Sequence, residues 1–314
     1  MKQFLLNILK FLPLAAVFYV LMVVFWGEVM PERYQKNLIY NRGTFGHTLS
    51  RLTDARNTKN VDVLFLGAST CYRGFDTRYF ESKGLTSFNL GSSSQTPINT
   101  NLLLKHYLQQ IKPKLVVYEV YPETFQIDGV ESTLDITAND RLDFYSMQMV
   151  FKTLNAKTLN TSIYAYYRQL AGKNTSNRQP KQRETDTYID HNGFVERELT
   201  YFKYLTYKKE VKNGKVVKKK WIIRQKQQAA FEATIALLKA EKIPYLLVRA
   251  PITSRLNDSY VNNREFNLYI SQFGRYLDFN NSLHLNDSLH FYDAVHLNQR
   301  GVKIFNEALY RKLR

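Results

Sequence analysis

The sequence predicts an α/β fold, in which a parallel sheet has helices on both faces. Three apolar runs in the first half of the chain, at residues 61–66, 85–90 and 115–120, have the length and composition of buried strands. Helical patterns near residues 76–83 and over residues 101–111 separate these runs. Regular alternation of strand and helix is typical of βαβ units, whose strands run parallel and are covered on both sides.

The same alternation returns in the last third of the chain. A helical pattern over residues 222–242 precedes an apolar run at 245–248, and a second pattern over residues 260–273 precedes another run at 276–279. A closing amphipathic helix is expected over residues 299–313. We therefore expect five strands in the sheet, with the closing helix packed on it.

Residues 123–220 interrupt this pattern after the third strand. They are rich in Tyr, Asn, Thr and Lys, and only residues 144–170 have a helical pattern. A run of low hydrophobicity follows at residues 172–186, and then a basic segment. Because about a hundred residues is long for a loop, we expect an insertion that has its own structure and covers the site.

The N-terminus predicts a membrane anchor. Residues 4–26 are mostly apolar, and residues 11–26 carry no charge. As a helix this stretch would be about 34 Å long at roughly 1.5 Å per residue, enough to cross a bilayer. A cleaved signal peptide and a buried core helix are the alternatives, but no Ala-x-Ala-like cleavage site follows Trp26. We expect a single-pass anchor at residues 1–28 in the cytoplasmic (inner) membrane, and a polar, irregular juxtamembrane connection at residues 29–60.

The orientation of the domain follows from the order of the segments rather than from charge. Basic residues lie on both sides of the apolar stretch, so their count does not fix the orientation. A short tail followed by an anchor and a large domain is a common arrangement for export. We therefore expect residues 61–314, the α/β domain with its insertion, to be extracytoplasmic.

The net charge of +17 favours an anionic partner. Much of this charge lies in residues 203–224, where Asn213-Gly214 predicts a tight turn between two Lys-rich strands. A solvated hairpin explains this charge, and a surface for an anionic membrane or an envelope polysaccharide is the alternative. Nucleic acid is not expected, because no nucleic-acid-binding motif is present and the anchor argues against it. The single cysteine, Cys71, excludes a disulfide within the chain.

Three residues predict a Ser–His–Asp site. Ser69 follows the first apolar run at once, in Gly67-Ala68-Ser69, where a tight turn at the carboxyl edge of a parallel sheet would present its hydroxyl. Asp293 lies three residues before His296, so its carboxylate can orient the imidazole and stabilise the protonated form. The imidazole could then take the hydroxyl proton of Ser69. A helix cap for Ser69 and a salt bridge at a helix start for the pair are the structural alternatives.

Gly91 is the candidate for stabilising the negative charge of a reaction intermediate. It follows the second apolar run, so its N–H and that of Ser69 could form an oxyanion hole, although a tight turn explains Gly91 equally well. Cys71 could be proposed as the nucleophile, but we expect it to pack as a small apolar side chain. No spacing of His, Cys, Asp or Glu indicates a metal site, and no cofactor is expected.

These motifs together resemble the SGNH (GDSL-like) hydrolase superfamily, in Gly67-Ala68-Ser69, in Gly91 and in Asp-Ala-Val-His-Leu-Asn-Gln-Arg-Gly at residues 293–301. The resemblance covers roughly residues 60–122 and 222–314. It is closer to the membrane-anchored branch, which includes the alginate O-acetyltransferase group and the protein of lipoteichoic acid D-alanylation. It implies a flavodoxin-like parallel sheet with an N-terminal span. The chain departs from the family in having Ala where Asp or Ser is usual before the serine, and in lacking the Gly-x-Asn-Asp block with its Asn oxyanion donor.

The resemblance implies a membrane-anchored acyl-ester hydrolase or O-acyltransferase. Acetyl is the expected acyl group, and a cell-envelope polysaccharide is the expected substrate. Ser69 would be the nucleophile, His296 the base and Asp293 the residue that orients the base. The alternative is a catalytically inactive accessory protein in envelope polymer assembly, working beside a multi-span membrane acyltransferase. The two departures from the family motifs favour that alternative.

Overall fold

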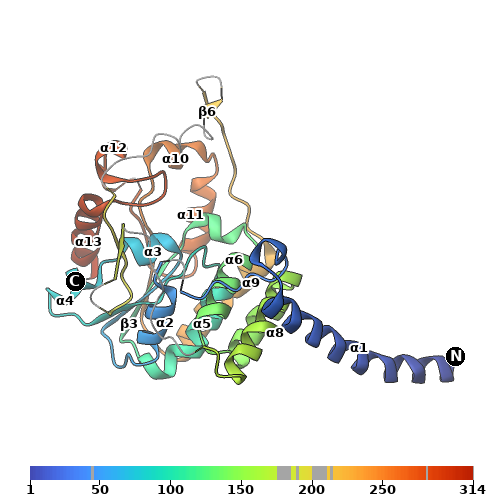
Figure 1. The fold of residues 1–314 in the computed structure, drawn as a ribbon. Coiled ribbons are helices and arrows are strands. Elements are labelled where there is room, and N and C mark those ends of the chain that lie inside the picture. Colours follow the sequence, from blue (N-terminus) through green and yellow to red (C-terminus); the bar gives the residue numbers. More distant parts are fainter. Residues whose placement is uncertain are drawn as a thin grey trace.

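A single parallel sheet organises the protein (Figure 1). The computed structural model describes residues 1–43, 46–174, 185–188, 191–199, 211–212, 215–280 and 282–313. The strands of the sheet are β1 (Val63–Leu66), β2 (Ser87–Asn89), β3 (Leu115–Glu119), β8 (Tyr245–Arg249) and β9 (Tyr276–Asp278). Their order is β2-β1-β3-β8-β9, and every neighbouring pair runs parallel. Counted along the chain this is the 2-1-3-4-5 order of flavodoxin-like sheets, so the predicted fold class is confirmed.

Helices cover both faces of the sheet, because alternate side chains of each strand point to opposite sides. The covering helices include α5 (Pro97–Ile111) and α9 (Gln225–Ala240) on one face, and α4 (Thr77–Glu81) and α13 (Gln299–Leu313) on the other. Leu64 of β1 lies in the core under α5 and α9, and its neighbour Phe65 lies in the core under α4 and α13. Both side chains are fully buried. Other short elements of this domain are α10 (Ser254–Ser259), α11 (Asn263–Ser271), α12 (Asp287–His290) and the 3-10 turn η2 (Pro122–Phe125).

The connection after the N-terminal helix contains more structure than the sequence indicated. The 3-10 turn η1 (Glu32–Tyr34) is followed by the helix α2 (Thr48–Ala55). Leu49 and Leu52 of α2 are buried against the domain. The expectation of irregular structure is wrong for these residues, because a helix of eight residues is too short to give a clear apolar repeat.

The residues between β3 and α9 form helices followed by short strand pairs. The helices are α6 (Val130–Asn139), α7 (Phe144–Thr153) and α8 (Ala156–Leu170); the strand pairs are β4 (Asp186–Thr187) with β5 (Glu196–Arg197), and β6 (Val211–Lys212) with β7 (Lys215–Val216). The single helix expected at residues 144–170 divides at Leu154, which adopts a positive φ of 39°. The sequence did not predict α6.

The pairing of β6 with β7 brackets the predicted Asn213-Gly214 turn, which itself lies outside the described residues, as does most of the run at 172–186. Figure 1 shows this hairpin projecting from the body, well separated from the base of α1. The division of the chain at residues 28 and 60 stays a prediction.

The helix α1 (Lys2–Val29) extends out of the body (Figure 1). Among the described residues it is the one helix long and apolar enough to cross a membrane, and a membrane anchor and a signal sequence both fit it. Its C-terminal end packs closely on α8, because a Cβ at Gly27 would lie 2.5 Å from the Tyr164 ring. Glu28 accepts hydrogen bonds from Tyr164 Oη at 3.1 Å and from Lys173 Nζ at 2.5 Å. These contacts fix the end of α1 against α8.

Candidate active site

The turn after β1 places Ser69 at the carboxyl edge of the sheet. Gly67 and Ala68 follow the strand, and Ser69 is the first residue of the short helix α3 (Ser69–Gly74). Gly67 has a φ of 153°, and a Cβ there would lie 2.6 Å from Glu119 Oε2. Glycine is therefore required for the chain to reverse over the end of β3 and present the serine hydroxyl.

A closed loop between α12 and α13 carries the other two candidate residues. Phe291 and Leu297 form an antiparallel bridge at its base, and the Tyr292 N–H donates to the His296 carbonyl at 3.1 Å. Inside the loop, Asp293 Oδ1 accepts the N–H of His296 at 2.7 Å and that of Val295 at 2.8 Å. The local Asp-x-x-His spacing thus builds a turn in which the carboxylate lies beside the imidazole.

Folding brings Ser69 to this loop across 227 positions of the chain. Ser69 Oγ lies 2.8 Å from His296 Nε2. His296 Nδ1 lies 2.9 Å from Asp293 Oδ2 and 3.0 Å from Oδ1. A carboxylate facing Nδ1 requires the ring proton on that nitrogen, so Nε2 is left to accept the serine hydroxyl proton.

The environment of Asp293 keeps its carboxyl group ionised. Burial alone would raise its pKa, but attraction to His296 and the hydrogen bonds from the His296 ring and the two backbone N–H groups outweigh this effect. The net result is a pKa below the ordinary value of 3.8. A permanently charged carboxylate can stabilise a protonated His296 during a reaction.

Gly91 lies next to the nucleophile turn, but its N–H is already in use. A Cβ at this position would lie 3.0 Å from the Gly67 carbonyl, so glycine allows the two loops to approach. The Gly91 N–H donates to Asn89 Oδ1 at 3.1 Å. By contrast, the Ser69 N–H has no acceptor within the described part of the chain. The oxyanion role of Gly91 therefore stays a prediction that requires its N–H to leave Asn89.

A buried carboxyl group supports the serine turn from beneath. Glu119, the last residue of β3, is 3% exposed, and its Oε2 accepts the Ala68 N–H at 3.2 Å. Its Oε1 has no partner among the described residues. Burial raises the pKa of Glu119 to about 7. The sequence analysis did not identify Glu119. Its position directly after the apolar residues of a buried strand could have indicated a buried acid at the edge of the sheet.

An aromatic ring and a cation extend the site beyond His296. The Tyr292 ring stacks on the His296 ring, with centroids 5.4 Å apart and planes 5° apart. The Arg197 guanidinium lies over the Tyr292 ring at 5.1 Å. Tyr292 directly precedes Asp293 and could have been noticed, whereas nothing in the sequence links Arg197 to the site.

A cavity of about 680 Å³ opens over Ser69 and His296. The insertion contributes much of its wall, including residues from α6, α8, β4 and β5: Val130, Glu131, Leu134, Asp135, Lys157, Asp186 and Arg197. Arg73 of α3 holds this wall in place, with Nη1 donating to Asp186 Oδ1 at 3.2 Å and Nη2 to Oδ2 at 3.0 Å. The catalytic candidates and the insertion therefore share one cavity.

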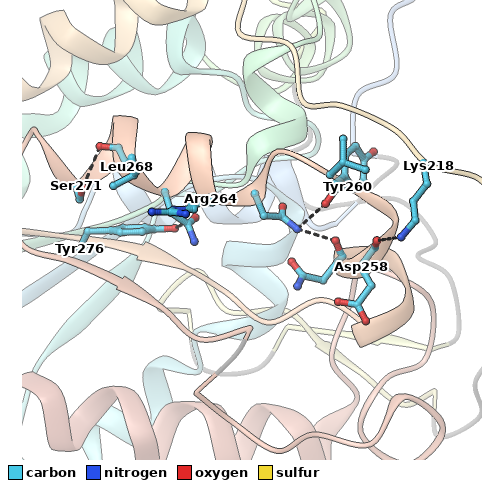
Figure 2. A pocket seen from close by; sticks show the side chains of 11 residues that line it. Lys218, Asp258, Tyr260, Arg264, Leu268, Ser271 and Tyr276 are labelled. Carbon is cyan, nitrogen blue, oxygen red and sulfur yellow. Dashed lines mark hydrogen bonds between the residues drawn. The ribbon is translucent and has the colours of Figure 1, made fainter.

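A second cavity, of about 860 Å³, lies over α10, α11 and β9 (Figure 2). None of the predicted site residues lines it. Its amide side chains are hydrogen-bonded within the fold: Asn263 Nδ2 donates to the backbone carbonyls of Asn257 at 2.7 Å and Tyr260 at 3.1 Å. The buried Arg249 donates to both asparagine Oδ1 atoms, at 2.8 and 3.0 Å. These amides have structural partners, so the candidate chemistry lies in the first cavity.

The alternative nucleophile, Cys71, is fully buried. Its Sγ donates to Asn89 Oδ1 at 3.3 Å, and burial raises the pKa of the thiol. A protonated, enclosed thiol is a poor nucleophile. The expectation that Cys71 packs as a small apolar side chain is confirmed.

No protein-family model and no curated protein matches this chain. Among solved structures it is similar to a candidate acylhydrolase from Bacteroides fragilis, with 13% identity, a TM-score of 0.36, and coverage of 91% of this chain and 98% of that one. It is also similar to a GDSL-like lipase from Bacteroides thetaiotaomicron, with 15% identity, a TM-score of 0.28, and coverage of 85% and 97%.

Proposed function

We propose that the protein is a membrane-anchored serine enzyme that cleaves or transfers acyl esters. The observation that carries this proposal is the chain of contacts from Ser69 Oγ to His296 Nε2, 2.8 Å, and from His296 Nδ1 to Asp293 Oδ2, 2.9 Å. Both distances lie within the range for proton transfer between a nucleophile and its base. The cavity above them provides room for a substrate.

In the proposed reaction, Ser69 Oγ attacks the carbonyl carbon of an ester while its proton passes to His296 Nε2. Asp293 stabilises the imidazolium that forms. When the tetrahedral intermediate collapses, the ester C–O bond breaks and the leaving alcohol takes the proton from His296. The acyl group then remains on Ser69. Water or a sugar hydroxyl then attacks the acyl carbonyl carbon while His296 Nε2 takes its proton. The bond between the acyl carbon and Ser69 Oγ breaks, and Oγ takes the proton back from His296.

The developing negative charge needs hydrogen-bond donors. We assign the Ser69 N–H as one donor, and the Gly91 N–H as a second donor once it exchanges Asn89 for the substrate oxygen. The family's Asn donor has no counterpart in this chain, so the hole has fewer donors than is usual. We therefore expect slower turnover than at sites that have the Asn donor.

The substrate class and the location are the finer part of the proposal. We propose O-acetyl esters of an envelope polysaccharide as the substrate class, in an extracytoplasmic domain held at the membrane by α1. The apolar α1 and the net charge of +17 support a membrane location and an anionic partner. A multi-span membrane acyltransferase is the proposed partner if the enzyme transfers acyl groups rather than hydrolysing them.

The test is turnover of an activated acetyl ester, such as p-nitrophenyl acetate, by the full-length protein in detergent. Ser69→Ala removes the nucleophile and leaves the surrounding packing unchanged, so we expect turnover to fall to the background rate. Ser82→Ala, an exposed serine on the same domain, is the matched control and should keep wild-type turnover. Undiminished turnover by a folded Ser69→Ala protein would end this assignment.

One observation favours a second candidate, a catalytically inactive accessory protein in envelope polymer assembly. The Gly91 N–H is bonded to Asn89 rather than left open for an oxyanion. In an inactive protein the contact between Ser69 and His296 would stabilise the fold and would not serve catalysis. Folded wild-type protein that turns over no ester, with the same background as Ser69→Ala, would favour the accessory role over the enzyme.

A further inference from the structure

The helices α7 and α8 meet at a corner whose outer surface is apolar. Phe151, near the end of α7, is 62% exposed, and Leu154, between the two helices, is 77% exposed. Leu159, on the second turn of α8, is exposed as well. We call these three residues the α7–α8 corner. Large apolar side chains that are exposed together on one part of a protein indicate a contact surface.

The helix α8 exposes apolar side chains and buries mostly polar ones. Its exposed residues, none of which is charged, are Ala156, Leu159, Tyr166 and Leu170. Its buried residues are Thr158, Thr161, Ser162, Tyr164 and Ala165. A helix on the surface of a protein in water has the opposite pattern. The exposed face of α8 therefore suits an apolar environment better than water.

The contacts of α8 with α1 show how far the corner reaches along the apolar helix. Tyr164, in the middle of α8, packs on Gly27 near the end of α1, whereas Asn160, closer to the start of α8, accepts the Tyr19 hydroxyl proton. Tyr19 lies eight residues before Gly27, about 12 Å along α1 at roughly 1.5 Å per residue, and within the uncharged stretch 11–26.

The start of α8 therefore points along α1 towards the middle of the apolar helix. The α7–α8 corner precedes Asn160 in the chain, so it lies at the level of Tyr19 or deeper. Figure 1 shows α8 beside the base of α1. A bilayer core about 30 Å thick takes up roughly 20 residues of a helix, so a bilayer that α1 crosses extends at least to the level of Tyr19. The corner then meets lipid.

The polar groups of α8 at this level have partners within the protein. Asn160 Nδ2 donates to the Asn37 carbonyl at 2.9 Å, so both ends of the Asn160 amide are bonded. The Thr161 hydroxyl accepts the Ile39 N–H at 3.0 Å and donates to the Ile39 carbonyl at 3.2 Å. Next to lipid, polar groups must be satisfied in this way because water is scarce.

We infer that the α7–α8 corner is seated in the surface layer of the membrane that α1 crosses, with its apolar side chains among the lipids. The exposed Lys152 beside Phe151 can carry its charge outward to the lipid headgroups. Lys157, on the first turn of α8, lines the cavity over Ser69, so a seated corner holds that cavity close to the membrane surface. This inference rests on the proposed anchoring by α1 but not on the proposed catalysis.

The experiment measures fluorescence quenching of single labelled sites in the full-length protein, reconstituted as one copy per lipid nanodisc. Leu154→Cys and Phe151→Cys, both at exposed positions, carry a thiol-coupled NBD fluorophore. Leu289→Cys on α12 is the matched control, because Figure 1 shows α12 on the side of the body away from α1. Leu12→Cys reports whether α1 lies in the bilayer. Wild type gives the labelling background, because Cys71 is fully buried.

The quenchers are phosphatidylcholine with a nitroxide near the headgroup or deep in the acyl chain, and aqueous iodide. We expect the shallow nitroxide to quench residues 151 and 154 and iodide to quench neither, because an interfacial apolar face lies about 5–10 Å below the headgroup boundary. Residue 289 should show the reverse. The deep nitroxide should quench residue 12.

Each other outcome overturns the inference in a recognisable way. Quenching of residues 151 and 154 by iodide alone, with residue 12 quenched by the deep nitroxide, would leave the anchor intact and place the corner in water. Shielding of both corner residues from lipid nitroxide and from iodide would mean that protein covers the corner. Failure of the deep nitroxide to quench residue 12 would overturn the proposed anchor, and the seated corner with it.

Discussion

Asp293 sets the proton position on His296, and this role can be tested with one substitution. In Asp293→Asn, the amide oxygen can still accept the backbone N–H groups of Val295 and His296, but an NH₂ group replaces the second carboxylate oxygen. The His296 tautomer with its proton on Nε2 then becomes favourable, and that nitrogen cannot take the proton of Ser69. We expect kcat for an activated ester to fall by about 10³–10⁴-fold, with KM little changed.

The control for Asp293→Asn is near-ultraviolet circular dichroism in the same detergent, which shows whether the variant keeps the wild-type fold. The loop geometry should persist, because both backbone hydrogen bonds to the side chain persist. A folded variant that retains more than about a tenth of wild-type kcat would show that Asp293 does not orient the base.

Glu119 makes the stability of the protein depend on pH. Its pKa is about 7 in the folded state, against an ordinary value of 4.5. Between these values the folded state holds a proton that the unfolded chain releases, so the free energy of unfolding falls as the pH rises through this window. At roughly 1.4 kcal/mol for each pH unit, the full loss is about 3 kcal/mol. The stabilisation is complete below about pH 4.5 and is lost above about pH 7.

Glu119→Gln removes the titration while keeping an oxygen that can accept the Ala68 N–H. We expect urea unfolding midpoints at pH 5, 6, 7 and 8 to vary less with pH in Glu119→Gln than in wild type. The comparison uses the slope of the unfolding midpoint against pH. A change in stability that the amide causes equally at every pH therefore does not affect the result. Parallel pH profiles for the two proteins would contradict a buried, titrating Glu119.

At the scale of elements, one ion pair joins the catalytic helix to the insertion. Arg73 of α3 and Asp186 of β4 are both buried, with 8% and 3% of their side chains exposed. Burial would raise the pKa of Asp186, but its hydrogen bonds and attraction to Arg73 outweigh this and lower it. Asp186→Asn would leave the Arg73 charge without its carboxylate, so we expect a loss of about 3–5 kcal/mol in unfolding free energy.

A double variant separates the effect of the buried charges on stability from the effect of side-chain packing. Arg73→Met with Asp186→Leu replaces this ion pair by apolar groups. It should recover part of the stability that Asp186→Asn loses, because Arg197, 3.4 Å from Asp186, loses its carboxylate partner in both proteins. Thermal unfolding of the three proteins measures this difference. Equal stability of Asp186→Asn and wild type would mean that the insertion is not held to α3 by this pair.

The elements differ in how far their sequences specify them. The closing helix has its predicted bounds, Gln299–Leu313, because its apolar residues repeat regularly over four turns. The helices α2 and α6 were missed, because they are short and their burial depends on neighbours far away in the chain. The break between α7 and α8 at Leu154 requires a positive φ in a non-glycine residue, which no local pattern announces.

The candidate site also contains residues that the sequence predicts and residues that it does not. Ser69, Asp293 and His296 could be predicted, because each lies in a short motif whose local geometry aims its side chain. Their contact across 227 positions follows from the parallel sheet, which brings the loops after its strands to one edge. Arg197 could not be predicted, because it reaches the site from an insertion with no recognisable pattern.

At the scale of the whole molecule, the role of α1 decides where the protein works. The contacts of Glu28 with Tyr164 of α8 and with Lys173, just after α8, tie the apolar helix to the folded domain. We predict from these contacts that α1 stays in the mature protein. We expect peptides from residues 2–29 to be recovered from the mature protein, which should stay with membranes during alkaline carbonate extraction. Loss of those peptides in mature protein would identify α1 as a cleaved signal sequence.

The most direct measurement concerns the reactivity of Ser69. A fluorophosphonate forms a stable adduct only with an activated serine, and peptide mass spectrometry locates the adduct. We predict that the full-length wild-type protein is labelled at Ser69, and that His296→Ala is labelled at least about a hundredfold more slowly, because it lacks the base. Folded wild-type protein that is not labelled at Ser69, or equal rates in the two proteins, would contradict an activated nucleophile.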